Sequence, residues 1–343
     1  MKRLLNTLYV LSEDVYLVLD GENIVTRRKN KDTGRVPLHT IESIVSFSYA
    51  GASPALMGAC VQRGVSLSFF SPRGKFLARV QGEPRGNVLL RRQQYRWADC
   101  EEQSIALSKN FIIGKLFNSR QVLERAIRDH GIRIDAEKVK SISLSLKKSI
   151  AKAQVATSSA ELRGIEGDAA AMYFGVFDEL VLREKDHFHF SGRNKRPPKD
   201  PINAMLSLFY TVLSNDCASA LEGVGLDPYV GLMHVDRPGR KSLALDLMEE
   251  IRSTMVDRFV LTAINNRVVK PENFAIQESG EVRINSDGRR TLFRAWQERK
   301  RDKIMHPFLK EKIEWGLVPH VQALLLARCI RGDLDGYPPF LWK

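Results

Sequence analysis

A histidine precedes a cluster of acids in the stretch GLMHVDRPGRKSLALDLMEEIR, residues 231–252. Asp246 lies 12 residues after His234, and Glu249 lies 15 residues after it. If the segment is helical, Asp246 and Glu249 occupy positions i and i+3 on one face and can point towards one ion, whereas Glu250 is turned away. Imidazole and carboxylate together suit manganese or magnesium better than calcium, and the histidine favours manganese. The spacing therefore predicts a divalent-metal site.

A basic turn separates the histidine from the acids. The sequence Arg-Pro-Gly-Arg at 237–240, followed by Lys241, lets the chain double back and brings His234 towards the acids. Acids alone repel phosphate and bases alone only bind it, so the combination indicates a metal that acts on nucleic acid. Two alternatives stay open: a lone histidine is more often part of a core, and residues 246–250 can be a solvated helix face.

A third ligand must come from elsewhere in the chain, and Glu166 is the best candidate. It lies between Gly164 and Gly167, and a run of alanines follows at 169–171. Small residues let another segment approach closely, which is how a buried site forms around one acid. The alternative is a glutamate near a helix N-terminus that interacts with the helix dipole.

One long polar segment, HFHFSGRNKRPPKDPINAM at 187–205, interrupts the helical pattern. Its prolines and charges contribute little to a core, but its cations can reach a phosphate backbone. These cations are Arg193, Lys195, Arg196 and Lys199. A solvated surface loop is the alternative.

The composition favours a polyanionic partner. The 343 residues include 53 lysines and arginines against 40 aspartates and glutamates, a net charge of +13 with a pI near 9.6. Such a balance indicates nucleic acid more often than a membrane, although a merely basic enzyme is possible. The four cysteines are far apart, so neither a zinc site nor a disulfide framework is expected. With no apolar run near the roughly 20 residues of a membrane span and no cleavable leader, we expect a cytoplasmic protein without membrane contact.

The elements that must position these residues fall into two blocks. Residues 1–80 alternate like strands, with one short helix at SPALMGACVQRG, and predict a small β-sandwich-like domain. Residues 81–96 form a turn-rich linker and a basic stripe. Residues 97–343 show helical periodicity and predict a larger all-α domain that carries the candidate site. The fold class is therefore α+β with two domains, as the length also suggests. The C-terminal GYPPFLWK either docks on a partner or folds back.

Four motifs occur in an order that is specific to one family. They are GIEGDAAAMYF (164–174), PPKDPINAMLSLFYTVL (197–213), GLDPYVGLMHVDRPGRKSLALDLMEEIR (225–252) and VDRFVL (256–261). Together they resemble the CRISPR-associated integrase family, Cas1, of prokaryotic adaptive immunity, which also has a basic β-domain before a helical domain. The resemblance implies a divalent-metal-dependent DNA endonuclease and integrase, a hydrolase-type enzyme of CRISPR adaptation in antiviral defence.

The resemblance also implies roles for individual residues. Glu166, His234 and Glu249 fall on the positions that bind manganese or magnesium in the family. Asp246 matches a nearby acid that supports catalysis. The residues expected to hold DNA near the metal are Arg193, Arg196, Asn203, Arg240 and Lys241.

The family's reaction is a transesterification. The 3′-hydroxyl of a short captured DNA, the protospacer, attacks a phosphodiester at the edge of a CRISPR repeat. Insertion at two places implies double-stranded DNA as substrate and two homodimers bridged by a small partner, Cas2. It stays open whether an additional end-processing Cas nuclease joins them. From the residues alone, a metal-dependent nuclease that acts on branched DNA in repair and a non-catalytic basic DNA-binding scaffold are the alternatives.

Overall fold

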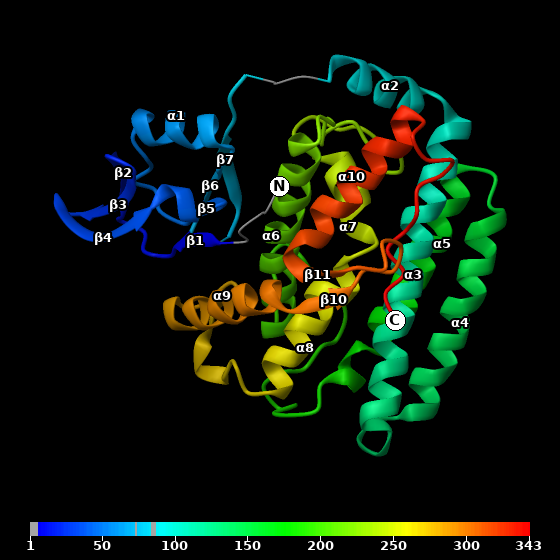
Figure 1. The fold of residues 1–343 in the computed structure, drawn as a ribbon. Coiled ribbons are helices and arrows are strands. Elements are labelled where there is room, and N and C mark those ends of the chain that lie inside the picture. Colours follow the sequence, from blue (N-terminus) through cyan, green and yellow to red (C-terminus); the bar gives the residue numbers. More distant parts are fainter. Residues whose placement is uncertain (1–5, 73, 84–86) are drawn as a thin grey trace.

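The computed structural model describes residues 6–72, 74–83 and 87–343, with strands first and helices after them (Figure 1). The N-terminal elements alternate apolar and polar residues because each sheet has one face on a core. They are β1 (Thr7–Val10), β2 (Tyr16–Asp20), β3 (Asn23–Arg28), β4 (Lys31–Pro37), β5 (Ser43–Ser46), α1 (Pro54–Arg63), β6 (Ser66–Phe70) and β7 (Phe76–Val80).

These strands form two sheets. In one, β2, β3 and β4 are antiparallel neighbours; the other has the order β1-β5-β6-β7, in which only the β6–β7 pair is antiparallel. The two sheets and α1 share an apolar core that includes Leu17, Ile24, Leu56 and Leu67. The predicted strand-rich N-terminal region with one short helix is confirmed.

The short helix begins and ends where its sequence signals it. The Ser53 hydroxyl accepts the N–H of Leu56 at 3.2 Å, and Pro54 is the first helical residue. Gly64 ends the helix in the left-handed region at φ +69°, which favours glycine.

Helices make up most of the chain after residue 87, as predicted. In Figure 1, α3 and α4 run side by side as long neighbours, and α5 packs on both. The apolar α6 contacts α7, α8 and α10. The helices are α2 (Val88–Asp99), α3 (Glu101–His130), α4 (Ala136–Val155), α5 (Ser159–Gly175), α6 (Pro201–Gly223), α7 (Ser242–Glu249), α8 (Arg258–Asn265), α9 (Ser286–Arg301) and α10 (Val318–Arg331).

The structure differs in part from the predicted linker and all-α C-terminal region. Two small hairpins are present, because short segments with tight turns satisfy their backbone groups by pairing; they are β8 (Phe274–Ile276) with β9 (Val282–Ile284), and β10 (Lys303–Met305) with β11 (Lys312–Glu314). A π-helical turn, Ser253–Asp257, joins α7 to α8. The predicted linker at 81–96 is partly helical, since α2 begins at Val88; its residues 84–86 lie outside the described residues.

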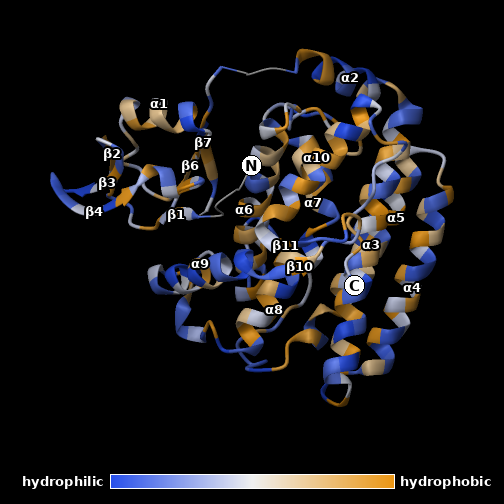
Figure 2. Ribbon diagram, viewed as in Figure 1, coloured by the Kyte–Doolittle hydropathy of each residue, from blue (hydrophilic) through white to orange (hydrophobic). Residues whose placement is uncertain are grey.

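Aromatic rings join the two regions. The centre of the Phe293 ring on α9 lies 4.5 Å from the ring centre of Tyr9, 5.2 Å from that of Phe47 and 5.5 Å from that of Phe209. The sheet containing β5 and β6 therefore shares a core with the helices, while the tip of the β3–β4 hairpin is hydrophilic (Figure 2). None of the helices in the described residues combines the length and the apolar run that a membrane-spanning helix needs.

We predict that Phe293→Ala lowers the free energy of unfolding by about 3–5 kcal/mol, because the ring is buried among residues of both regions. Urea unfolding followed by circular dichroism measures this change. The control is Phe308→Ala, whose ring is 47% exposed and whose removal should change stability little. Equal stability of the two variants would show that the shared aromatic core contributes nothing.

Candidate functional site

Three segments far apart in the sequence deliver the candidate metal ligands. Glu166 comes from α5, His234 from the loop between α6 and α7, and Glu249 is the last residue of α7. Ser158 caps α5 and Glu161 is its first-turn acid, so Glu166 lies about two turns inside the helix. The helix dipole therefore does not explain the place of Glu166, because its effect fades after the first turn.

A lysine that the sequence did not single out joins two of these acids. The Lys115 ammonium, on α3, donates to Glu249 Oε2 at 2.6 Å and also to Glu166 Oε1. The side chains of Lys115 and Glu249 are only 8% and 7% exposed. Two carboxylates repel each other in such a place unless a cation lies between them, and the ammonium is that cation.

Arg252 supplies a second positive charge. Its Nη1 donates to the two carboxylate oxygens of Glu249 at 3.1 and 3.3 Å. Burial alone would raise the pKa of Glu249, but the charges of Lys115 and Arg252 outweigh it and lower that pKa to about 2. Glu249 is therefore ionised at neutral pH, which is the form that binds a metal ion.

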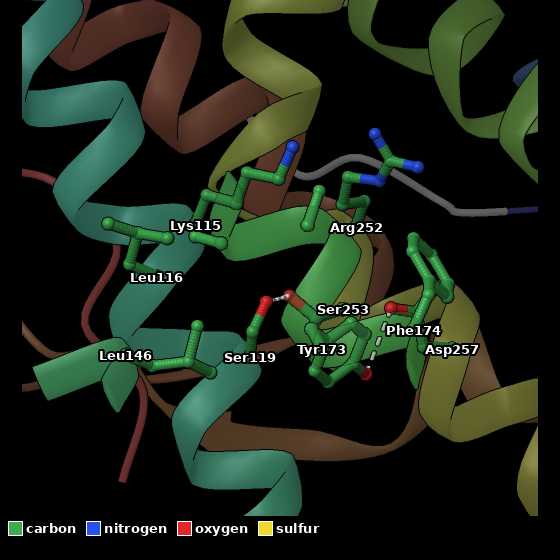
Figure 3. A pocket seen from close by; sticks show the side chains of 11 residues that line it. Lys115, Leu116, Ser119, Leu146, Tyr173, Phe174, Arg252, Ser253 and Asp257 are labelled. Carbon is green, nitrogen blue, oxygen red and sulfur yellow. Dashed lines mark hydrogen bonds between the residues drawn. The ribbon is translucent and has the colours of Figure 1, made fainter. Parts of the chain in front are cut away.

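Arg252 is itself held by a buried network. Its guanidinium lies 4.1 Å from the centre of the Tyr210 ring. The Tyr210 hydroxyl donates to Asp257, which also accepts the Tyr173 hydroxyl at 3.1 Å. Figure 3 shows Lys115 and Arg252 with their charged ends directed to the same side, above the Tyr173–Asp257 hydrogen bond. The cavity between them has a volume of about 10 Å³, room for roughly one water molecule.

Asp246 fixes the position of the histidine. Its carboxylate is fully buried and accepts the backbone N–H groups of Leu232, Met233 and His234 at 2.7–3.0 Å. It also lies 2.5 Å from His234 Nδ1. The loop closes this tightly because residue 231 is glycine; a Cβ on Gly231 would lie 2.5 Å from the carbonyl oxygen of His234. With its oxygens occupied by these donors, Asp246 holds His234 in place.

The contact with Asp246 also sets the chemistry of the imidazole. Since a carboxylate only accepts, Nδ1 carries a proton, and Nε2 is left for a ligand. Burial would lower the pKa of His234, but the hydrogen bond and charge of Asp246, with the charge of Glu249, raise that pKa above its ordinary value.

The donor set suits a divalent cation, although a metal ion would have to replace the ammonium of Lys115. Within the described residues, no three His, Cys, Asp or Glu side chains are already gathered closely enough to hold a metal ion. Glu166 and Glu249 nevertheless share one cation, the Lys115 ammonium, and the charge of His234 acts on Glu249. Two carboxylates and an imidazole fit manganese or magnesium once the ammonium moves aside.

Arg193 and Asn203 hold the polar loop against the start of α6. Arg193 Nη1 donates to Asn203 Oδ1 at 2.6 Å, and Asn203 Nδ2 donates to the carbonyl of Gly192 at 2.8 Å. Asn203 is fully buried. These contacts tie residues 191–200 to the start of α6. The expected contact of the Asn203 amide with DNA does not agree with this burial.

The other predicted phosphate contacts divide into two groups. Lys241 faces inward: its Nζ lies 3.6 Å from the centre of the Phe76 ring on β7, and burial lowers its pKa to about 8. Arg196 is exposed and Arg240 partly exposed, so both are accessible to a phosphate. Lys195 is also exposed, and its pKa is lowered by partial burial and then by the charges of Arg252 and Arg193, so it lies near the site.

Lys115 and Arg252 were not predicted from the sequence, although each leaves a signal there. Lys115 is a single cation within the apolar run FIIGKLF, where α3 is buried. Arg252 follows Glu249 by three residues, the spacing of neighbours on one helix face. A buried cation at helical spacing from a predicted ligand therefore marks a charge partner.

We predict that Lys115→Met lowers the free energy of unfolding by about 3 kcal/mol in chelator at neutral pH, because Glu249 then lacks its main counter-charge. Adding Glu249→Gln should recover part of this loss, which a double-mutant cycle in urea measures. Lys138→Met, at an exposed pair with Glu179, is the control and should change stability little. Additive effects of the Lys115 and Glu249 substitutions would contradict the proposed pairing.

We predict that His234 titrates above its ordinary pKa of 6.5 in the metal-free protein. Because the folded pKa is raised, the stabilisation is fully present below about pH 6.5 and is lost as the pH rises through the folded pKa. Proton NMR of the imidazole follows the titration, and melting temperatures from acid to alkaline pH follow the stability. His234→Gln should lack this loss. An imidazole that titrates at or below 6.5 would contradict the charge coupling to Asp246.

Comparison with known proteins identifies the fold. A chain solved as a casposase bound to its integration product matches with a TM-score of 0.84 and 22% identity, over 98% of this chain and 93% of that one. A chain of a Cas6-RT-Cas1–Cas2 complex matches with a TM-score of 0.79 and 22% identity, over 98% of this chain and 36% of that one. At such identities the likeness concerns the fold.

Sequence comparison extends this to the family. CRISPR-associated endonuclease Cas1 1 of Chlorobaculum tepidum is 47% identical over 343 residues, and CRISPR-associated endonuclease Cas1 2 of Rhodospirillum rubrum is 48% identical over 347 residues. Each match covers the whole of both chains. The family model described as CRISPR associated protein Cas1 matches residues 8–298. The chain belongs to the Cas1 family.

Proposed function

We propose that this chain is a divalent-metal-dependent DNA endonuclease and integrase of CRISPR adaptation, which joins the 3′-hydroxyl ends of a protospacer to the CRISPR repeat. The observation that carries the proposal is the convergence of Glu166 and Glu249 on one cation position, beside a histidine held by buried Asp246. Two relatives named as Cas1 endonucleases, 47% and 48% identical, support it.

Glu166, Glu249 and the free Nε2 of His234 would hold manganese or magnesium. The ion would neutralise charge on the pentacovalent phosphate and stabilise the attacking or leaving oxygen. Asp246 keeps the histidine in the tautomer that presents Nε2, and Arg252 keeps Glu249 ionised. The side chains thus bind, orient and set charge, and none of them has to act as a nucleophile.

The reaction exchanges one phosphodiester for another. The 3′-oxygen of the protospacer forms a new P–O bond, the P–O3′ bond of the repeat strand breaks, and the released 3′-oxygen takes up a proton in place of the one lost by the attacking hydroxyl. The number of phosphodiester bonds stays constant, so no nucleoside triphosphate is consumed. With water as the attacking group, the same site hydrolyses DNA, which accommodates both an endonuclease and an integrase.

The basic loops provide the DNA contacts. Arg196 and Arg240 are accessible to solvent, and Lys195 adds a cation that interacts with Arg252 of the site. Such side chains bind phosphates and position the duplex without reading its bases. Arg193 and Lys241 would support DNA binding indirectly, because Arg193 anchors its loop to α6 and Lys241 anchors its loop to β7.

Insertion of two ends requires more than one copy of the chain. We propose a homodimer formed through the N-terminal strands, and two such dimers bridged by Cas2. A fold neighbour was solved in a complex named for Cas1 and Cas2, which supports this partner. The edge strand β4 exposes most of its residues and is available to another chain.

We predict that a strand-transfer assay distinguishes the candidate functions. Purified chain, a Cas2 partner, a supercoiled plasmid with a repeat and a labelled duplex with free 3′-hydroxyls are incubated with manganese, magnesium or chelator. Wild type should join the label to the plasmid only with metal. His234→Ala and Glu249→Gln should lose at least about a hundredfold in rate, as removal of a ligand or its support does.

The control for this assay is Glu137→Gln, an exposed acid on α4 that should leave joining unchanged. Metal-dependent nicking that needs neither repeat nor Cas2, and that the site variants lose, would favour the branched-DNA nuclease. Full joining by both site variants would contradict the catalytic site and favour a DNA-binding scaffold.

A further inference from the structure

The C-terminal segment folds back onto the helical region. Tyr337 and Phe340 are buried, and the Tyr337 ring lies 5.3 Å from that of Phe111 on α3. The Trp342 ring lies 5.3 Å from that of Trp315. Of the two possibilities that the sequence left open for GYPPFLWK, the folded-back one is present in this chain. A segment so fully packed has a structural partner within its own chain.

That partner is the buried carboxylate of Glu250. It accepts the Tyr337 hydroxyl, the backbone N–H of Phe340 at 2.8 Å and the side-chain amide of Gln322 at 3.1 Å. A carboxylate is stable in such a place only when donors surround it, and two of these three donors come from residues 337–340. The C-terminal segment therefore supplies most of the hydrogen bonds on which the burial of Glu250 depends.

Asn118 on α3 fastens the same two parts together. Its Nδ2 donates to the carbonyl of Glu250 at 2.5 Å and to the carbonyl of Phe340 at 2.6 Å, and its Oδ1 accepts the N–H of Trp342 at 3.0 Å. Gly114, one turn earlier, lets α3 come this close, because a Cβ there would lie 2.7 Å from Glu250 Cβ. The backbone at Glu250 is thus clamped between α3 and the C-terminal segment.

Glu250 directly follows Glu249, and the two side chains point to different sides. Successive residues of a helix are rotated by about 100°, and their Cα atoms are about 3.8 Å apart. Glu249 faces Lys115 and Arg252, while Glu250 faces Tyr337 and Phe340. Since α7 ends here and a π-helical turn follows, regular helical hydrogen bonds do not hold this turn alone. The contacts of both glutamate side chains therefore add to what holds this turn.

We propose that the C-terminal segment Tyr337–Phe340 is a positioning element of the candidate metal site, which sets the direction of Glu249 by anchoring Glu250. The proposal rests on the proposed function, in that Glu249 is taken as a metal ligand. Glu250 and Tyr337 are positioning residues: they act through Glu249 and contact neither metal nor DNA. Loss of their hydrogen bond lets the turn rotate, and metal affinity falls while the fold persists.

The test measures manganese affinity and melting temperature separately, on full-length protein. Tyr337→Phe removes the hydroxyl and keeps the buried ring. It should raise the dissociation constant for manganese, measured by calorimetry, at least about tenfold, as loss of a residue that supports a metal ligand does. Glu250→Gln keeps an acceptor oxygen and should weaken binding less than Glu250→Ala. Melting in chelator reports the stability of each variant.

Two controls separate positioning from general stability. Trp342→Ala removes a ring that packs on Trp315 and Arg258, so it should lower the melting temperature but leave manganese affinity unchanged. Tyr95→Phe removes a hydroxyl that bonds to Asp227 instead of Glu250, and should also leave the affinity unchanged. If Tyr337→Phe and Trp342→Ala lower both quantities in the same proportion, the segment has only a structural role and the inference is wrong.

The outcome for Glu249→Gln separates this inference from the proposed function. If Glu249→Gln binds manganese as wild type does, the metal site itself is wrong, whatever the C-terminal variants do. If Glu249→Gln loses binding while Tyr337→Phe retains wild-type affinity, the metal site stands and only the positioning role is overturned.

Discussion

The site depends on an ionised carboxylate that is buried. Glu249 would be unstable as an anion at 7% exposure without the two cations that contact it, Lys115 and Arg252. These come from different elements, so the site exists only when α3 has packed against the junction of α7 and the π-helical turn. Lys115 in turn needs acidic partners because it is buried, and Glu249 and Glu166 are those partners. Charge balance therefore ties the correct packing of three helices to the formation of the candidate active site.

The local patterns could be predicted from the sequence, but the contacts between distant segments could not. The i, i+3 spacing of Asp246 and Glu249 is real, yet Asp246 turns to the backbone of residues 232–234 and Glu249 to Lys115. Spacing determines which residues share a helix face. Only tertiary packing determines which side chain or backbone group each of these residues contacts. The Lys115–Glu249 contact joins α3 to the end of α7, far apart in the sequence, so no local pattern contains it.

Charged composition is an incomplete guide to which cations are exposed, for the same reason. The loop at 191–199 was expected to extend its cations to solvent, but Arg193 bonds to buried Asn203. Its guanidinium satisfies polar groups of the loop and of α6, which a segment with two prolines and few backbone partners requires. Lys241 similarly packs on Phe76 of β7. These two cations hold the loops that carry Arg196 and Arg240. The composition therefore indicates where the basic loops are, but only the burial of each side chain shows which cations are exposed there.

α3 connects the two sides of the junction. Lys115 and Ser119 face the side of Glu249 and Ser253, where Ser119 Oγ lies 3.1 Å from Ser253 Oγ, while Gly114 and Asn118 face Glu250. These are i, i+4 pairs on two adjacent stripes of one helix, so any shift of α3 changes both sets of contacts together. A single rigid helix can therefore hold two neighbouring glutamates in opposite environments, one open to a cation and one closed by the C-terminal segment. That geometry couples the packing of the chain's last residues to the direction of a candidate metal ligand, although the last residues never enter the site.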